Sequence, residues 1–314
     1  MYHLEKYKGR NANRYVCPQC GQPHVFTRYV DDEGNYIADD VGKCDRIAKC
    51  GYHYTPRQYY TDNPWDKERR VKRRYVEPPK PRPVYLPMEY VDVRESADSP
   101  FVHWVRALFG DIALKVAADY RLGATKAGLY KSPAVIFWQI DVDNRVRDGK
   151  MMWYKPNGHR EKWMTWITAK LKAAGKYPDQ QSEKCLFGEH LLKANPDKPV
   201  GLVESEKSAI VCSCLYPDIL WVATCGCGGL NADKVSPLYG HRVLVLPDTG
   251  AYYKWNEVMM SSGIDYRIVS IENYPPNTDI VDILIDKAQP REGEPTDINE
   301  IIEQWKSTQP SNSN

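Results

Sequence analysis

The fold is decided by Val200-Gly201-Leu202-Val203, which ends at Glu204, and by Arg242-Val243-Leu244-Val245-Leu246-Pro247, which ends at Asp248. A helical stretch over 205–215 and another apolar run over 219–223 lie between them. Short apolar runs that alternate with helices are typical of βαβ units and a parallel sheet. Because ligands gather at the carboxyl ends of such strands, we expect Glu204 and Asp248 to hold a divalent cation together.

The alternative for each carboxylate is that it caps the helix that follows, which is the commoner role for a single acid. Two acids that end separate strands of one sheet favour the site. Beyond Asp248 the alternation continues, and we expect a helix over 252–261, a strand over 266–271, a helix over 279–287 and a last helix from 296. We assign residues 196–314 to this α/β domain.

The composition is that of an ordinary globular protein. A chain of 314 residues is long enough for about two domains. Hydrophobic residues make up 42% and charged residues 27%, with a net charge of +2. The first twenty residues lack the apolar core of a signal peptide, and no apolar run approaches the roughly 18 residues of a membrane helix. We therefore expect a cytoplasmic protein with no membrane segment.

Cysteines near the N-terminus predict a metal site. Nine cysteines without a secretion signal argue against a disulfide framework. The first pair lies in Cys17-Pro18-Gln19-Cys20-Gly21, and the second, Cys44 and Cys50, also ends at a glycine, which allows a tight turn. Two such turns present four thiolates to a tetrahedral structural Zn²⁺. We expect a zinc ribbon over residues 1–60 with ligands Cys17, Cys20, Cys44 and Cys50. The spacing of the second pair is wide, so His53 is the alternative ligand and His24 a remote one.

Residues 61–90 form a basic, proline-rich linker. Proline keeps such a segment extended, and clustered cations attract phosphate by counterion release. The cations are Lys67, Arg69, Arg70, Lys72, Arg73, Arg74, Lys80 and Arg82. A solubilising spacer is the alternative to a nucleic-acid contact, and beside a zinc ribbon we favour the contact.

Residues 91–195 are expected to be an α+β region. Ser99-Pro100 is a typical helix start, with a capping hydroxyl followed by proline. Residues 134–154 predict a hairpin whose returning strand carries Arg145, Arg147 and Lys150. This hairpin is suited equally to gripping a nucleic-acid backbone or nucleotide and to forming a solvated face. An amphipathic helix is predicted over 161–174.

Three short motifs resemble those of a known family. The segment Val203-Glu204-Ser205-Glu206-Lys207-Ser208-Ala209 resembles the glutamate motif of Toprim domains, which occur in bacterial primases, topoisomerases and some nucleases. Leu246-Pro247-Asp248-Thr249-Gly250 resembles the position of their Asp-x-Asp motif, and Asp279-Ile280-Val281-Asp282 resembles the acidic stretch after the last Toprim strand in phage and plasmid primases. Residues 185–192 look like the junction that precedes Toprim there. With a zinc ribbon in front, the order is similar to that of primase-like proteins of phages and mobile genetic elements.

The resemblance implies a Toprim-like parallel sheet with flanking helices, preceded by the α+β region and the small zinc ribbon. It implies Mg²⁺ or Mn²⁺ for phosphoryl transfer, with Glu204, Asp248, Asp279 and Asp282 as the acids at the site and Lys207 as a phosphate contact. It also implies DNA, single-stranded, and nucleotides as ligands, and a replicative helicase as a partner.

One position departs from the family. Gly250 stands where the second aspartate of Asp-x-Asp is expected, whereas two-metal catalysis needs ions roughly 3.5–4 Å apart, each held by enough carboxylates. Asp279, Asp282 and Glu206 are the residues that would compensate. The leading hypothesis is a Mg²⁺-dependent, primase-like, DNA-binding protein of a mobile element. The alternatives are a Toprim nuclease and a non-catalytic DNA-binding protein for replication or transfer, which Gly250 favours.

Overall fold

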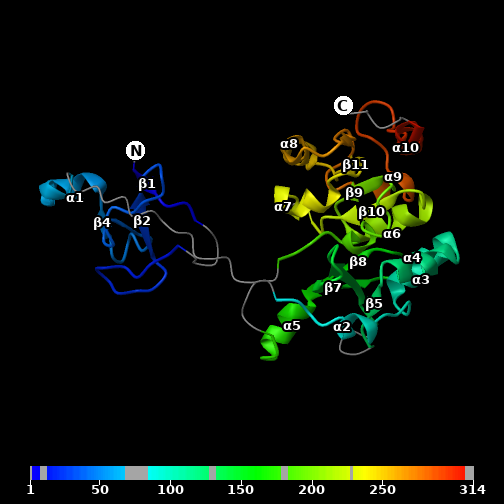
Figure 1. Cartoon of the computed structure of the whole chain (residues 1–314), viewed down its shortest axis with the longest axis horizontal. Helices are drawn as coiled ribbons and strands as arrows, with labels where there is room; N and C mark the ends of the chain where they lie inside the picture. Colours follow the sequence, from blue (N-terminus) through cyan, green and yellow to red (C-terminus); the bar gives the residue numbers. More distant parts are fainter. Residues whose placement is uncertain are drawn as a thin grey trace. The chain divides into compact units, whose positions relative to one another are not determined.

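The computed structural model describes residues 2–7, 13–67, 84–126, 132–177, 183–226 and 229–307. The chain divides into two compact units, Met1–Pro81 and Arg82–Asn314 (Figure 1), which are described separately. Nearly all the basic residues of the expected linker lie outside the described residues, so the nucleic-acid contact predicted there stays a prediction. The finer division at residues 60, 90 and 195 likewise stays a proposal.

The first unit is built on a small antiparallel sheet in the order β1-β2-β3-β4. Its elements are β1 (His3–Leu4), β2 (Phe26–Val30), β3 (Gly42–Cys44), β4 (His53–Tyr54), α1 (Pro56–Asp62) and η1 (Pro64–Lys67). Buried Phe26, Cys17 and Cys44 form its core, with half-buried neighbours such as Tyr15 and Tyr52 around them. Such a core removes little apolar surface from water, which makes a metal or other crosslink the expected source of stability.

The second unit begins with an antiparallel sheet in the order β5-β6-β7-β8. Its elements are α2 (Glu89–Asp92), α3 (Pro100–Phe109), α4 (Ile112–Asp119), β5 (Gly123–Ala124), β6 (Val135–Ile140), β7 (Val146–Tyr154), β8 (Arg160–Trp166) and α5 (Ile167–Ala173). The expected hairpin is confirmed, because β6 pairs with β7. Helix α3 begins as expected, with Ser99 Oγ accepting a hydrogen bond from the Val102 N–H at 3.3 Å.

The helix expected over 161–174 is wrong in its first half. Residues Arg160–Trp166 form strand β8, which pairs with β7 and places Lys150 opposite Trp166. Tryptophan and threonine favour strands, and the free edge of β7 supplies hydrogen-bond partners. The helix, α5, begins only at Ile167.

The rest of the second unit is a parallel sheet with helices on both faces, which confirms the expected α/β class. After η2 (Glu189–Leu191), its elements are β9 (Val200–Val203), α6 (Glu206–Leu215), β10 (Leu220–Ala223), α7 (Ala232–Val235), η4 (Ser236–Leu238), β11 (Val243–Leu246), α8 (Tyr252–Ser262), β12 (Tyr266–Ile268), α9 (Ile280–Leu284) and α10 (Ile298–Ser307). The strands run in the order β10-β9-β11-β12, all parallel. The chain passes from β9 outward to β10 and then returns to the other side of β9, so the order reverses between β9 and β11.

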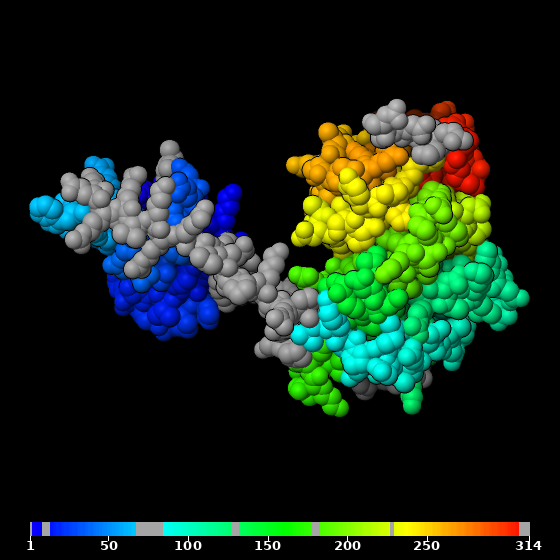
Figure 2. All heavy atoms as spheres, in the orientation of Figure 1, coloured from blue at the N-terminus to red at the C-terminus, as the bar shows by residue number. Residues whose placement is uncertain are grey.

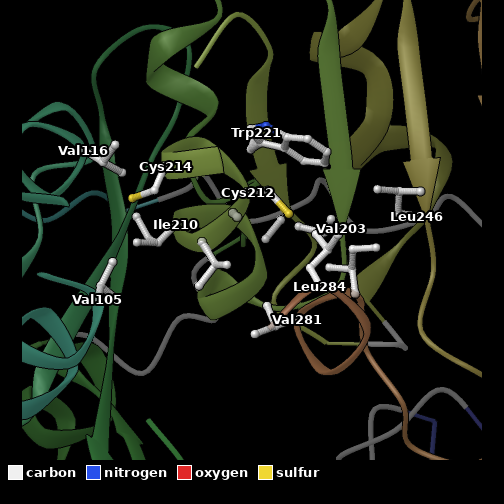
Figure 3. Close-up of a cluster of buried hydrophobic side chains, with 14 of the residues drawn as sticks. Val105, Val116, Val203, Ile210, Cys212, Cys214, Trp221, Leu246, Val281 and Leu284 are labelled. Carbon is white, nitrogen blue, oxygen red and sulfur yellow. The ribbon is translucent and has the colours of Figure 1, made fainter. Parts of the chain in front are cut away.

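Alternate residues of each parallel strand enter two different cores. Val203 of β9, Trp221 of β10 and Leu246 of β11 pack with α6 and α9 on one face (Figure 3). Leu202, Val222 and other residues of the opposite face pack against η4 and α8. Figure 2 shows α8 (orange) and α10 (red) on the surface of this unit at the end away from α2 (cyan). Each face therefore has its own hydrophobic layer.

The antiparallel and parallel sheets share the first of these cores. Phe137 of β6 and Tyr154 of β7 belong to the same buried cluster as Val203 and Ile210. The α3–α4 pair completes this layer through Val105 and Val116 (Figure 3). None of the helices in the described part of the chain has the length and apolar character needed to span a lipid bilayer.

Candidate functional site

The four predicted cysteines of the first unit come together. The sulfur atoms of Cys17, Cys20, Cys44 and Cys50 all lie within 4.8 Å of one another, and those of Cys17 and Cys50 are 3.7 Å apart. The glycine turns have the expected backbone, since φ is +66° at Gly21 and +71° at Gly51. The wide second spacing is taken up by a turn in which the Cys50 N–H donates to the Arg46 carbonyl at 2.8 Å.

The surroundings of the thiols differ. The backbone N–H of Gln22 lowers the pKa of Cys20 to about 7, while burial raises the pKa of Cys44 to about 12. A thiolate at Cys44 therefore needs a cation close to it, whereas the surroundings of Cys20 already favour its thiolate. His53 lies elsewhere: its Nε2 is 2.9 Å from the Tyr29 hydroxyl, and the two rings are stacked. The arrangement supports Zn²⁺ at an all-cysteine site.

The two strand-end acids leave the parallel sheet side by side. Val203 and Leu246 are paired in register, so Glu204 and Asp248 follow neighbouring central strands at the carboxyl edge. The strand order reverses between these same two strands. In open α/β sheets, this reversal opens the crevice in which ligands bind.

Two loops bring a third and a fourth acid to this edge. The Thr249 N–H donates to the Thr278 carbonyl and the Thr278 N–H donates to Thr249 Oγ1, each at 3.1 Å. These bonds hold the segment after Asp248 against the start of α9. Asp279 and Asp282 form a capping box there, in which Asp279 Oδ1 accepts from two backbone N–H groups and Asp282 Oδ2 accepts from the Asp279 N–H at 2.8 Å. Both acids thus also serve as the cap of α9.

Asp248 has the most perturbed environment of the group. Burial, together with the nearby carboxylates of Glu204, Asp279 and Asp282, raises its pKa to about 8, against the opposing effect of Lys207. Within the described part of the chain, its buried Oδ1 has no hydrogen-bond partner. An orphaned buried carboxylate oxygen is costly unless a proton or a cation joins it.

Lys207 lies in the first turn of α6, where the sequence predicted it. Its Nζ is 3.4 Å from Asp279 Oδ2, and the side chain is 18% exposed. The ammonium therefore lies among the acids and is paired with one of them. Among the described residues, the four cysteines form the one set of three or more side chains close enough together to hold a metal ion, and the acids at this edge form no such set.

The missing second aspartate leaves a different arrangement around Gly250. Its φ is +86°, and its N–H lies 2.9 Å from both carboxylate oxygens of Glu272. Glu272 thereby receives an N–H just before helix α8. Sequence reasoning missed Glu272, although Ile268-Val269-Ser270-Ile271 before it is one more apolar run that stops on an acid.

The cations of the hairpin are engaged within the fold. Arg145 and Arg147 both donate to buried Asp141 Oδ2, at 2.9 and 2.8 Å, and both stack on the ring of Tyr85. Lys150 forms a buried ion pair with Glu206 at 2.9 Å. These three cations therefore have partners within the unit, while Arg145 remains 42% exposed, so contact of this hairpin with a nucleic acid or nucleotide stays a prediction.

Comparisons with known proteins agree with the two-part organisation. Residues 1–65 match the model of a zinc beta-ribbon finger family, and residues 99–249 match the "Domain of unknown function (DUF6371)". No curated protein matches the chain in sequence.

Similar solved structures are DNA primases. The primase fragment of the bacteriophage T7 primase-helicase protein is 14% identical, with a TM-score of 0.43 over 93% of this chain and 98% of that one. The DnaG primase catalytic domain bound to ssDNA is 15% identical, with a TM-score of 0.45 over 69% and 75%. The zinc-binding and RNA polymerase domains of the Aquifex aeolicus primase are also 15% identical, with a TM-score of 0.38 over 98% and 81%.

Proposed function

We propose that this chain is a primase-like protein that binds DNA and transfers nucleotidyl groups at a Toprim-like site with Mg²⁺ or Mn²⁺. One observation carries the proposal. Glu204 and Asp248 end neighbouring strands at the point where the strand order reverses, and a buried oxygen of Asp248 there has no partner within the described residues. An oxygen ligand of this kind fits a hard divalent cation.

The residues at this edge fit a cation held mainly by two carboxylates. Glu204 and Asp248 are the primary ligands in this proposal. Asp279 Oδ2 and Asp282 are further oxygens close by, although both acids also cap α9. Bound there, the ion would neutralise charge on nucleotide phosphates during transfer.

The chain's own groups would bind and orient the substrate. Lys207, in the first turn of α6 and paired with Asp279, is the cation placed to contact a phosphate. The Thr249–Thr278 hydrogen bonds fix the loop after Asp248, so the Asp248 carboxylate would already be in position before the substrate binds. A pre-arranged set of charges acts on developing negative charge without having to reorganise.

The first unit would supply DNA recognition. In this proposal Cys17, Cys20, Cys44 and Cys50 hold a structural Zn²⁺, and single-stranded DNA binds the ribbon and the basic linker. The first unit presents aromatic rings suited to stacking on bases, including Trp65 of η1, which is 81% exposed. Action on a mobile genetic element, beside a replicative helicase, belongs to the same proposal.

A primer-synthesis assay tests the function. The full zinc-loaded chain is incubated with single-stranded template, ribonucleotides and Mg²⁺ or Mn²⁺, and labelled products are resolved by length. We expect oligoribonucleotides from wild type and from the control Glu257→Gln, an exposed acid on α8, and none from Glu204→Gln. Absence of products from wild type, or their persistence in Glu204→Gln, contradicts catalysis at this site.

The structure around Gly250 gives a specific reason to test a second function. With no side chain there, and with Glu272 bound to its N–H, the site lacks one expected acid. A non-catalytic DNA-binding protein for replication or transfer would show tight, salt-sensitive binding of DNA without turnover. Metal-dependent cleavage of DNA in the same assay would instead indicate a nuclease.

A further inference from the structure

Two side chains of the antiparallel sheet contact residues near Glu204, one in the segment that follows it and one in the segment that follows β10. Lys150 Nζ of β7 lies 2.9 Å from Glu206 Oε2, in the first turn of α6, and these side chains are only 11% and 2% exposed. Gln139 Nε2 of β6 lies 3.1 Å from the sulfur of Cys225, just after β10. The antiparallel sheet therefore contacts both the segment that follows Glu204 and the segment that follows the neighbouring strand.

Both side chains belong to the face of the antiparallel sheet that enters the shared core. Lys150 is paired in register with Phe137, and Gln139 is two residues further along the same strand, so all three point to one side. Phe137 lies in the buried cluster that contains Val203, the last residue of β9. The apolar residues of this face pack against the end of β9, and its polar residues contact Glu206 and Cys225.

The backbone at Glu204 is tied to the same segments. Its carbonyl accepts from Thr224 Oγ1 at 3.3 Å and from the Gly226 N–H at 3.2 Å. On the other side, Ser205 Oγ caps α6 by accepting from the Ser208 N–H at 3.0 Å. Anything that fixes Glu206 and Cys225 therefore also fixes the backbone from which the Glu204 side chain projects.

The polar groups of this contact are not arranged for maximal stability. Glu206 Oε1 and Gln139 Oε1 are buried without a hydrogen-bond partner in the described part of the chain. A buried ion pair is often no more stabilising than an apolar pair of the same volume, whereas its geometry is specific. The contact is thus better explained by the position it gives to α6 than by the stability it adds.

We propose that Lys150 and Glu206 are positioning residues, which hold Glu204 in the orientation that binds the divalent cation. The antiparallel sheet then forms part of the metal site without supplying a ligand. This inference rests on the proposed function, because it takes Glu204 as a metal ligand. Partners that orient a ligand typically change metal affinity by about 10–100-fold when they are removed.

Manganese binding by the zinc-loaded full chain tests the inference, with free Mn²⁺ followed by electron paramagnetic resonance. We expect Lys150→Met and Glu206→Gln each to weaken Mn²⁺ binding by about tenfold or more. The double variant should bind no more weakly than either single variant, because the two side chains act as one unit. Additive losses, or unchanged affinity in either single variant, would overturn the proposal.

The chain offers a matched control for losing a buried lysine. Lys184 pairs with fully buried Asp148 of the same strand β7 and lies over the ring of Trp166, and the hydrogen bonds described for these two side chains are with residues outside α6. Lys184→Met should therefore lower thermal stability and leave Mn²⁺ affinity within about twofold of wild type. An equal loss of affinity in Lys184→Met would show that general destabilisation is the cause, which also overturns the proposal. If Lys150→Met fails to fold, Lys150→Met combined with Glu206→Met replaces it, since apolar replacement of both partners is tolerated.

Amide hydrogen exchange separates this inference from the proposed function. Lys150→Met should speed exchange in residues 204–208 and 224–226, whereas Lys184→Met should not. If wild type binds no Mn²⁺, or if Glu204→Gln binds it as well as wild type does, the proposed function fails, and exchange alone then decides whether Lys150 positions this segment. Equal exchange in the two variants contradicts the positioning role whatever the metal result.

Discussion

The cysteine cluster and the strand-end acids are both candidate metal sites, but they stand in opposite relations to the fold around them. In the first unit two of the cysteines, Cys17 and Cys44, are part of the small core itself and pack with buried Phe26. In the second unit, Glu204 and Asp248 lie at the edge of a sheet whose two faces already have separate apolar layers. The first unit should therefore fold only when metal is bound, whereas the second unit should fold without metal and bind it afterwards.

This difference predicts opposite responses to the loss of ligands. A structural metal contributes its binding free energy to folding, so a missing ligand unfolds the unit. Clustered acids repel one another and are desolvated, so removing one should stabilise the metal-free protein. The predictions below test this contrast, from the largest effect to the smallest.

The largest effect is expected for Cys44→Ser. We expect residues 1–67 to unfold and zinc content to fall from one equivalent toward zero, because structural zinc contributes roughly 10–16 kcal/mol to such units. Metal analysis and the loss of dispersed amide resonances measure this, while the thermal transition of the second unit should stay unchanged.

His53→Ala is the control for that experiment. Its ring contacts Tyr29, so the variant should keep one zinc and a folded ribbon. Loss of zinc in His53→Ala, together with its retention in Cys44→Ser, would contradict the all-cysteine ligand set.

Asp248→Asn should have the opposite effect on stability and should raise the Tm of the metal-free protein. The pKa of Asp248 is about 8 in the folded protein and roughly 3.9 in an unfolded chain. Its contribution to stability is therefore present below pH 4 and is lost as the pH rises through 8. At pH 8 without metal, Asp248→Asn should melt at least about 3 °C above wild type, which is roughly 1 kcal/mol for a unit of this size.

The same measurement across pH checks the cause. The difference in Tm between Asp248→Asn and wild type should shrink as the pH falls toward 4, because the wild-type carboxyl is then protonated. Added Mn²⁺ should raise the Tm of wild type and not that of Asp248→Asn. If Asp248→Asn has a lower Tm than wild type at pH 8, the ionised Asp248 carboxylate does not destabilise the metal-free protein.

Gly201→Ala tests whether the second unit relies on packing. A Cβ at Gly201 of β9 would overlap the buried ring of Trp221 on the neighbouring strand. Overpacking of this kind should lower the free energy of unfolding by about 1–3 kcal/mol. Urea unfolding with and without Mn²⁺ measures it, and an unchanged midpoint would show that this layer is loosely packed.

Gly250→Ala should have the smallest effect. The space around Gly250 is open, so the cost is that of placing alanine at φ +86°, on the order of 1 kcal/mol. The N–H donated to Glu272 is retained. Urea unfolding measures this cost. A decrease in the free energy of unfolding larger than that of Gly201→Ala would indicate that the turn at Gly250 stabilises the fold more than its contacts suggest.

The sequence predicted the elements that local patterns determine. The apolar runs of β9, β10 and β11 and the helix between Ser205 and Leu215 are where alternation placed them, because each run is as long as one strand. The cysteine cluster was equally predictable, since the glycine after each pair has the positive φ that the turn requires.

What the sequence did not predict depends on long-range pairing. Residues 160–166 have a helix-like apolar pattern, but β7 offers a free edge and they form β8 instead. The Lys150–Glu206 pair joins residues 56 positions apart, and no local pattern links them. The partners of Asp279 are also unpredictable from spacing, because its oxygens divide between the α9 cap and Lys207.

The central claim is that Glu204 and Asp248 together hold a divalent cation where the strand order reverses. A Mn²⁺ titration of the zinc-loaded full chain tests it most directly, comparing wild type, Glu204→Gln, Asp248→Asn and the exposed control Glu257→Gln. We predict that wild type and Glu257→Gln bind equally, and that each of the other two loses more than about 100-fold in affinity, beyond the effect of outer partners. Equal affinity in all four proteins would contradict the claim.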